Sequence, residues 1–128
     1  MRLLLDTHAL IWFFAGDERL PVGARNRIED LDAVVLVSAV SAIEVTLKHR
    51  LGKLPQAGRL ALDFEGVIER YGFVGLPISL AHAAAAGGLQ IPHKDPFDRL
   101  LIAQSLLDGV PLVSNETAFD AFGVTRVW

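Results

Sequence analysis

Residues Ala33-Val34-Val35-Leu36-Val37 form a run of five apolar side chains, without the polar alternation of a strand that has one face in water. Such a run is typical of a strand in a parallel sheet that helices cover on both faces. A helical pattern begins directly after it, because Val40, Ile43 and Leu47 follow one another at the spacing of one helix face. The strand and the helix together indicate a βα unit, the building block of α/β folds.

Short apolar runs alternate with longer helical patterns on both sides of this unit. We expect strands over Arg2 to Leu5, Ala33 to Val37, Gly72 to Leu76, Pro111 to Val113 and Thr125 to Val127. We expect helices over His8 to Ala15, Pro21 to Leu31, Ser38 to Leu51, Arg59 to Arg70, Ser79 to Ala86, Pro96 to Asp108 and Thr117 to Phe122. The order predicts an α/β fold with a mostly parallel sheet of about five strands, and Gly87 to Lys94 is expected to be its most mobile loop.

The composition excludes several classes of protein. The chain has 128 residues, 52% of them hydrophobic, with 12 basic and 15 acidic side chains and a formal charge of −3. This length and apolar content fit one domain, which we expect to span residues 1–128. The absence of cysteine excludes disulfides, thiolate metal sites and a cysteine nucleophile. The short apolar start, and the lack of any stretch near the roughly 18 apolar residues of a membrane span, predict a cytoplasmic protein without membrane contact.

Four acidic residues stand just after predicted strands or near the start of predicted helices. They are Asp6, Glu44, Asp98 and Glu116. In open parallel sheets the ligand site lies beyond the carboxyl ends of the strands, so we expect these carboxylates to share one crevice. Carboxylates that repel one another are best neutralised by a hard divalent cation, Mg²⁺ or Mn²⁺. The pattern therefore predicts a metal-dependent site.

Each acid also has a purely structural explanation. Asp6 would cap the helix that follows it. Glu44 would belong to a capping box or pair with Lys48 one turn later. Asp98 would interact with the dipole of its helix, and Glu116 would be an ordinary surface acid. The functional interpretation rests on all four lying at the same end of one sheet.

Four stretches that span the chain in order carry a more specific signal: Leu3-Leu4-Leu5-Asp6-Thr7-His8-Ala9-Leu10-Ile11-Trp12, Ser38-Ala39-Val40-Ser41-Ala42-Ile43-Glu44, His93-Lys94-Asp95-Pro96-Phe97-Asp98-Arg99-Leu100-Leu101-Ile102-Ala103-Gln104 and Leu112-Val113-Ser114-Asn115-Glu116. They closely resemble the PIN-domain ribonucleases, and specifically the VapC-type toxins of bacterial toxin–antitoxin pairs. The third stretch is the most specific. The resemblance implies a three-layer α/β/α sandwich that hydrolyses RNA phosphodiester bonds with Mg²⁺ or Mn²⁺.

The resemblance also assigns roles to individual residues. The matching positions are the catalytic and metal-binding acids Asp6, Glu44 and Asp98, the further metal ligand Glu116, and the supporting hydroxyl side chains Thr7 and Ser114. Glu116 stands where the family usually has Asp, so its direct contact with the metal is in question. Asp95 competes with Asp98, but the register of the third stretch favours Asp98 and leaves Asp95 as the helix cap.

Positive charge near the acids is needed to bind RNA, because phosphate contacts supply most of the nonspecific affinity. We expect Arg99 and Lys48, the latter in a basic run over residues 48–53, to contact phosphates. Arg99 has an alternative role as a surface ion pair or packed side chain. The four histidines lack ligand spacing, so none is expected to be catalytic, and His82 is expected to be a packed residue.

The first predicted helix contains Leu10-Ile11-Trp12-Phe13-Phe14, more apolar surface than one core face requires. We expect Trp12 or a neighbour to face outward, the alternative being that all the rings pack on the sheet. The resemblance implies two partners besides the RNA substrate, a second copy in a homodimer and a VapB-type antitoxin. It also allows an antitoxin arginine to bind the acids.

Two other functions stay open at this point. A phosphatase of the haloacid dehalogenase type also uses an aspartate after the first strand, but it requires an acid two residues later, where this chain has His8. A non-catalytic PIN-like binding module would keep the fold without holding metal. The Glu at position 116 is the feature that keeps this second possibility open.

Overall fold

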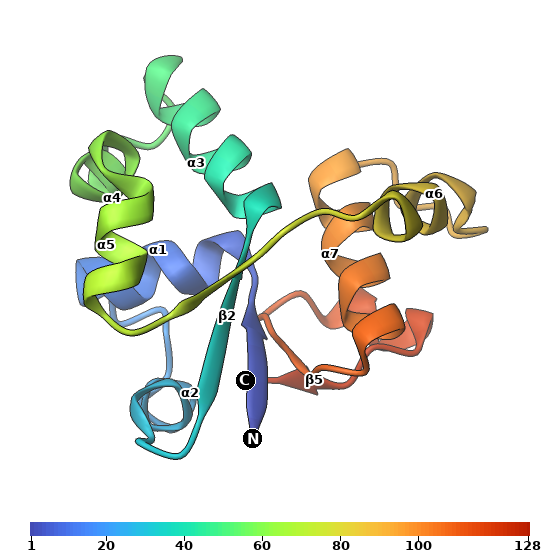
Figure 1. The fold of residues 1–128 in the computed structure, drawn as a ribbon, viewed down its shortest axis with the longest axis horizontal. Helices are drawn as coiled ribbons and strands as arrows, with labels where there is room; N and C mark the ends of the chain where they lie inside the picture. Colours follow the sequence, from blue (N-terminus) through green and yellow to red (C-terminus); the bar gives the residue numbers. More distant parts are fainter.

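The computed structural model describes residues 1–128 as one parallel sheet with helices on both faces (Figure 1). Its five strands lie in the order β3-β2-β1-β4-β5, and every neighbouring pair is parallel. The strands are β1 (Arg2–Leu5), β2 (Val34–Ser38), β3 (Val74–Leu76), β4 (Leu112–Val113) and β5 (Arg126–Val127). The predicted three-layer α/β/α fold with five strands is therefore confirmed.

The helices fall where the sequence predicts them, with one exception. They are α1 (Thr7–Ala15), α2 (Val22–Glu29), α3 (Ala39–Arg50), α4 (Gly58–Leu62), α5 (Phe64–Arg70), α6 (Leu80–Gly88) and α7 (Pro96–Asp108), with 3-10 turns η1 (Pro55–Ala57) and η2 (Thr117–Phe122). The single helix expected over 59–70 is wrong. Asp63 has φ −146° and ψ 57°, which no α-helix accommodates, so the chain breaks into α4 and α5 there.

Side chains that alternate along the strands build two separate cores. Leu3 and Leu5 of β1 face the layer formed by α1, α2, α4 and α5, whereas Leu4 faces the layer that contains α7. Figure 1 shows these helices on opposite sides of β1 and β2. Since all three leucines are fully buried, the uninterrupted apolar run of the strand is explained by helices on both faces.

The apolar surplus of α1 is mostly buried, so the expectation that Trp12 or a neighbour faces outward is wrong for Trp12. Trp12 is only 6% exposed and its ring packs edge-on against Trp128 at 5.9 Å. Phe13 is buried too, and the half-buried Phe14 packs edge-on against Tyr71 of the turn after α5 at 4.8 Å. No helix is both long enough and apolar enough to cross a membrane.

A chain of buried polar contacts fixes α6 and α7 against the end of β2. The Ser38 hydroxyl donates to Gln104 Oε1 at 2.6 Å, and Gln104 Nε2 lies 3.4 Å from His82 Nδ1. His82 accepts from the Ser79 amide through Nδ1, and its Nε2 lies 3.0 Å from Asp108 Oδ1. His82 is 6% exposed, which agrees with the predicted packed residue.

Candidate active site

Asp6 lies at the end of the central strand. Its amide continues the β1–β4 ladder by donating to the Val113 carbonyl at 3.0 Å, and its Oδ1 caps α1 by accepting from the Ala9 amide at 2.7 Å. The side chain is buried, and burial raises its pKa to about 6. Hydrogen bonds from Ser114 and Ala9 lower this pKa, and the charge of Asp98 raises it.

Glu44 comes from the second turn of α3 and is 5% exposed. Its carboxylate pairs with Lys48 one turn along the helix, as the sequence allowed. The alternative capping box is wrong, because the α3 cap is Ser38, whose hydroxyl accepts from the Val40 amide. Ser41 instead lies 3.0 Å from the Thr7 hydroxyl, and this buried contact joins the starts of α3 and α1.

Asp98 lies in the first turn of α7, after the Asp95 cap. Asp95 Oδ1 accepts from the amides of Phe97 and Asp98, as the sequence predicts. Partial burial is the largest cause of a raised pKa at Asp98, and the charges of Asp95 and Glu44 add to it. A hydrogen bond from His93 lowers this pKa, since His93 Nε2 lies 2.7 Å from Asp98 Oδ2.

Glu116 is the exposed member of the group. It follows β4, and its amide donates to the Ser114 hydroxyl at 3.0 Å. Its own Oε1 accepts from the Ala118 amide at 3.4 Å and so caps η2. Glu116 thus reaches the site from a short surface connection between β4 and η2.

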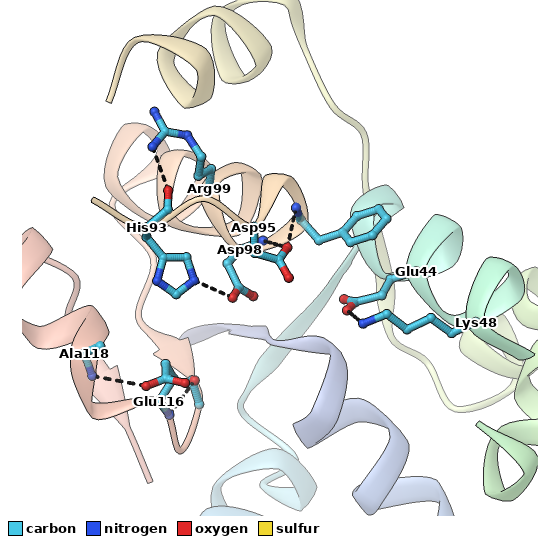
Figure 2. A network of polar contacts seen from close by, with 10 residues as sticks. Glu44, Lys48, His93, Asp95, Asp98, Arg99, Glu116 and Ala118 are labelled. Carbon is cyan, nitrogen blue, oxygen red and sulfur yellow. Dashed lines mark hydrogen bonds and ion pairs between the residues drawn. The ribbon is translucent and has the colours of Figure 1, made fainter. Parts of the chain in front are cut away.

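The four acids line one hollow of about 110 Å³. Its walls come from four separate segments: Asp6, Thr7, His8, Glu44, Lys48, Asp95, Asp98, Asn115, Glu116 and Phe119. Figure 2 shows Glu44, Asp98 and Glu116 around a common space. We call this hollow the acid pocket. A larger hollow of about 750 Å³ between α3, α5 and β3 is lined mainly by apolar residues, and its only acids are Glu65 and Glu69.

The donor set of the acid pocket fits a hard divalent cation. Acidic side chains make up much of its lining, and burial raises the pKa of both Asp6 and Asp98, so a cation would relieve the cost of their charge. No group of three or more acidic or histidine side chains is arranged to hold an ion as the side chains stand. In this arrangement Glu44 is paired with Lys48 and Asp98 with His93.

The two basic residues expected to contact phosphate differ sharply. Lys48 lines the acid pocket, with its Nζ 5.9 Å from the centre of the Phe97 ring. Arg99 points away from the carboxylates (Figure 2), and its guanidinium donates to five main-chain carbonyls instead. This geometry argues against the predicted phosphate contact of Arg99, because its guanidinium has no N–H group left to donate to a phosphate.

Three residues near the acids were missed by sequence reasoning. His8 and Asn115 line the acid pocket, and both are direct neighbours of assigned residues, so adjacency was the available signal. His93 contacts Asp98 from an irregular segment before α7. Because that segment has no helical or strand periodicity, nothing in its pattern indicated where the ring of His93 would lie.

Comparisons with known proteins identify the family of this chain. The PIN domain family model matches residues 3–124, and the chain therefore belongs to the PIN-domain family. Ribonuclease VapC22 of Mycobacterium tuberculosis is 30% identical over 114 residues, which cover 89% of this chain and 86% of that protein. Membership of this family removes the dehalogenase-type phosphatase as an alternative.

Solved structures share the fold at lower sequence identity. The VapBC2 complex of Rickettsia felis bound to a promoter DNA fragment matches with a TM-score of 0.73 and 17% identity, covering 99% of this chain and 98% of the matched chain. A toxin–antitoxin complex from Klebsiella pneumoniae matches with a TM-score of 0.67 and 19% identity, covering 98% and 96%. At these identities the likeness establishes the fold alone.

Proposed function

We propose that this protein is a metal-dependent ribonuclease and the toxin of a VapBC-type toxin–antitoxin pair, with residues 1–128 as one nuclease domain. The observation that carries the proposal is the meeting of Asp6, Glu44 and Asp98, from three distant segments, in one pocket. The raised pKa values of Asp6 and Asp98 are typical of a functional site, because burying charge without a partner is costly. The similarity to a VapC ribonuclease supports the choice of RNA as substrate.

Asp6, Glu44 and Asp98 would hold Mg²⁺ or Mn²⁺, and Glu116 would contribute from the edge of the pocket. A bound ion of this kind lowers the pKa of its water and neutralises charge on the scissile phosphate. Asp98 lines the pocket, and its Oδ2 is in contact with His93 Nε2. The Ser114 hydroxyl and the Ala9 amide fix the carboxylate of Asp6. Thr7 supports the arrangement indirectly by joining α1 to Ser41 of α3.

Lys48 would serve the site in two states. Without a cation, its ammonium group pairs with the carboxylate of Glu44. Once a cation takes that carboxylate, the ammonium is free to contact a phosphate of the RNA at the rim of the pocket. Lys48 is therefore our proposed phosphate contact on this chain.

The proposed partners and location follow from the same comparison. Two of the similar structures are described as VapBC or toxin–antitoxin complexes. We propose a cytoplasmic homodimer whose activity a VapB-type antitoxin blocks, with an antitoxin arginine binding Asp6 or Asp98 in competition with the cation. Titration of the purified pair at several Mg²⁺ concentrations tests this, because inhibition that ignores the metal concentration would contradict competition at the acids.

The decisive experiment is cleavage of a panel of structured RNAs with Mg²⁺ or Mn²⁺, with excess chelator, and with Asp98→Asn. We expect cleavage only by the wild type with metal. Cleavage that persists in chelator with both Asp6→Asn and Asp98→Asn would contradict the proposal. RNA binding without cleavage under every metal condition would favour the non-catalytic binding module.

A further inference from the structure

The guanidinium of Arg99 has every N–H group satisfied by the main chain. Nε donates to the Ala86 carbonyl at 2.9 Å, Nη1 to the carbonyls of Ile91 and His93 at 3.3 and 2.9 Å, and Nη2 to those of Gly87 and Leu89 at 3.3 and 2.6 Å. A guanidinium has five N–H donors in a planar fork, and all five are used here. We call residues 86–93, which supply these carbonyls, the clamped segment.

The clamped segment includes a helix end that has no cap of its own. Helix α6 ends at Gly88 with no basic residue in its last turn, and its C-cap Leu89 has φ −58° rather than a left-handed conformation. The carbonyls of a helix end therefore need an outside donor, and a positive charge is favoured there by the helix dipole. Arg99 of α7 provides both, which explains why this segment is held rather than loose.

The same clamp determines the position of His93. Arg99 Nη1 donates to the carbonyl of His93, while the ring of His93 contacts the carboxylate of Asp98, the residue before Arg99 (Figure 2). The ring also lies edge-on to Phe119 and Phe122, with centroids 5.6 and 6.2 Å away. Two consecutive residues of α7 thus hold the backbone and the side chain of one histidine.

We infer that Arg99 is a positioning residue that acts through His93 on Asp98, and that it does not bind RNA phosphate. This inference rests on the proposed nuclease function. Arg99 fixes the clamped segment, the segment fixes His93, and His93 holds Oδ2 of Asp98, which restricts the orientation of this carboxylate in the lining of the acid pocket. Without Arg99, the five carbonyls would be hydrogen-bonded by water and the ring of His93 would lose its contact with Asp98. The carboxylate of Asp98 would then gain rotational freedom.

Lysine cannot replace arginine in this role. Its ammonium keeps the charge but has three donors around one atom, which cannot reach five carbonyls spread over residues 86–93. Arg99→Lys therefore separates the two roles, because a phosphate contact depends mainly on charge and the clamp depends on shape. Arg70→Lys is the matched control, since Arg70 makes only an exposed ion pair with Asp63.

The first measurement needs no nuclease activity. We expect hydrogen exchange of Arg99→Lys to accelerate within residues 86–93 while β1, β2 and β4 stay protected, and the Nε2–H signal of His93 to be lost by NMR. Arg70→Lys should match the wild type in both. Unchanged exchange in the clamped segment, or faster exchange throughout the sheet, would overturn the inference, and this holds even if the wild type cleaves no RNA.

The second measurement concerns cleavage. Arg99→Lys and His93→Ala should each lower kcat by about 10 to 100-fold with KM changed little, as expected when support of a metal-site carboxylate is lost. The double variant should be no worse than either single one, because both break one chain of contacts. His93→Gln should recover part of the activity, since its amide can still donate to Asp98.

The salt dependence of RNA binding distinguishes the phosphate role directly. We expect the slope of log affinity against log salt to be the same for wild type, Arg99→Lys and Arg99→Gln. A slope reduced by about one in Arg99→Gln, with Arg99→Lys behaving as wild type, would assign Arg99 to phosphate binding and overturn the inference. Additive effects of Arg99→Lys and His93→Ala would also overturn it.

Discussion

The acid pocket has an inner and an outer side that differ in their access to water. Asp6 and Glu44 lie on the inner side, 7% and 5% exposed, where β1 and β2 lead into helices in the middle of the sheet. Glu116 lies on the outer side and is exposed, capping a short 3-10 turn. Since β4, which precedes Glu116, also lies inside the sheet, the exposure of Glu116 comes from the surface connection after that strand, whereas Asp6 and Glu44 are buried where a charge is costly to keep.

The same contrast indicates where tight binding of a cation would arise. Burial raises the pKa of Asp6 to about 6, so a cation would relieve a cost there. Glu116 is exposed and already accepts a hydrogen bond from the Ala118 amide. We therefore expect changes on the inner side to have large effects and changes on the outer side to have small ones.

The largest effect is expected when Asp6 or the half-buried Asp98 loses its charge. Asp6→Asn and Asp98→Asn should each lower RNA cleavage by about a hundredfold or more. Each carboxylate would help to hold a cation, and such a cation stabilises the charge of the transition state by about several kcal/mol. Circular dichroism should show an unchanged fold, since Asn caps helices as well as Asp does. Single-turnover cleavage at saturating metal measures the loss. Near wild-type rates in both variants would contradict the contrast.

The second effect concerns the stability of the metal-free protein. The pKa of Asp6 is about 6 in the folded protein, against an ordinary value of 3.8 for an aspartate in water, so the folded state binds more protons between these pH values, and its stability falls as pH rises through them. Asp6→Asn should therefore stabilise the protein by on the order of 2 to 3 kcal/mol at pH 7.5.

At pH 4 this gain should fall to a small fraction, because the folded-state carboxyl is then protonated and the unfolded one is only partly ionised. Thermal unfolding in excess chelator at pH 4 and pH 7.5 gives the measurement. Glu116→Gln is the control, and its stability should match the wild type because that side chain is hydrated. An equal gain from Asp6→Asn at both pH values would show that charge burial is not the cause.

A smaller effect is expected on activity at the outer side. Glu116→Gln should lower cleavage by about tenfold, less than Asp98→Asn does, because its longer side chain would contact the cation through water. Cleavage rates of the two variants, measured side by side across Mg²⁺ concentrations, decide this. Equal and complete loss would mean that Glu116 is a direct ligand and that the two sides do not differ in function.

The smallest effect is expected at the rim. Lys48→Gln should weaken RNA binding a few-fold and reduce the salt slope by about one, as for the loss of one phosphate contact. Binding measured in a non-cleaving Asp98→Asn background at several salt concentrations tests this. An unchanged salt slope would leave Lys48 only as the partner of Glu44.

The sequence by itself determined the elements and the chemistry of the pocket. Apolar runs such as Ala33 to Val37 predicted buried parallel strands, and polar residues after strands predicted the place of Asp6. Asp95 was identified as the α7 cap from sequence, because an Asp-Pro pair at a helix start carries its own local signal. These inferences succeed because the interactions involved lie within a few residues of one another.

Only the tertiary structure decided how distant groups pair. The role of Arg99 depends on where α6 ends in space, and the burial of Trp12 depends on Trp128 at the other end of the chain. The contact between His93 and Asp98 arises in a segment without periodicity, so no sequence pattern could locate it. Hydrogen-bond donors and aromatic rings have many possible partners in sequence, and packing selects among them through geometry that residue order alone does not express.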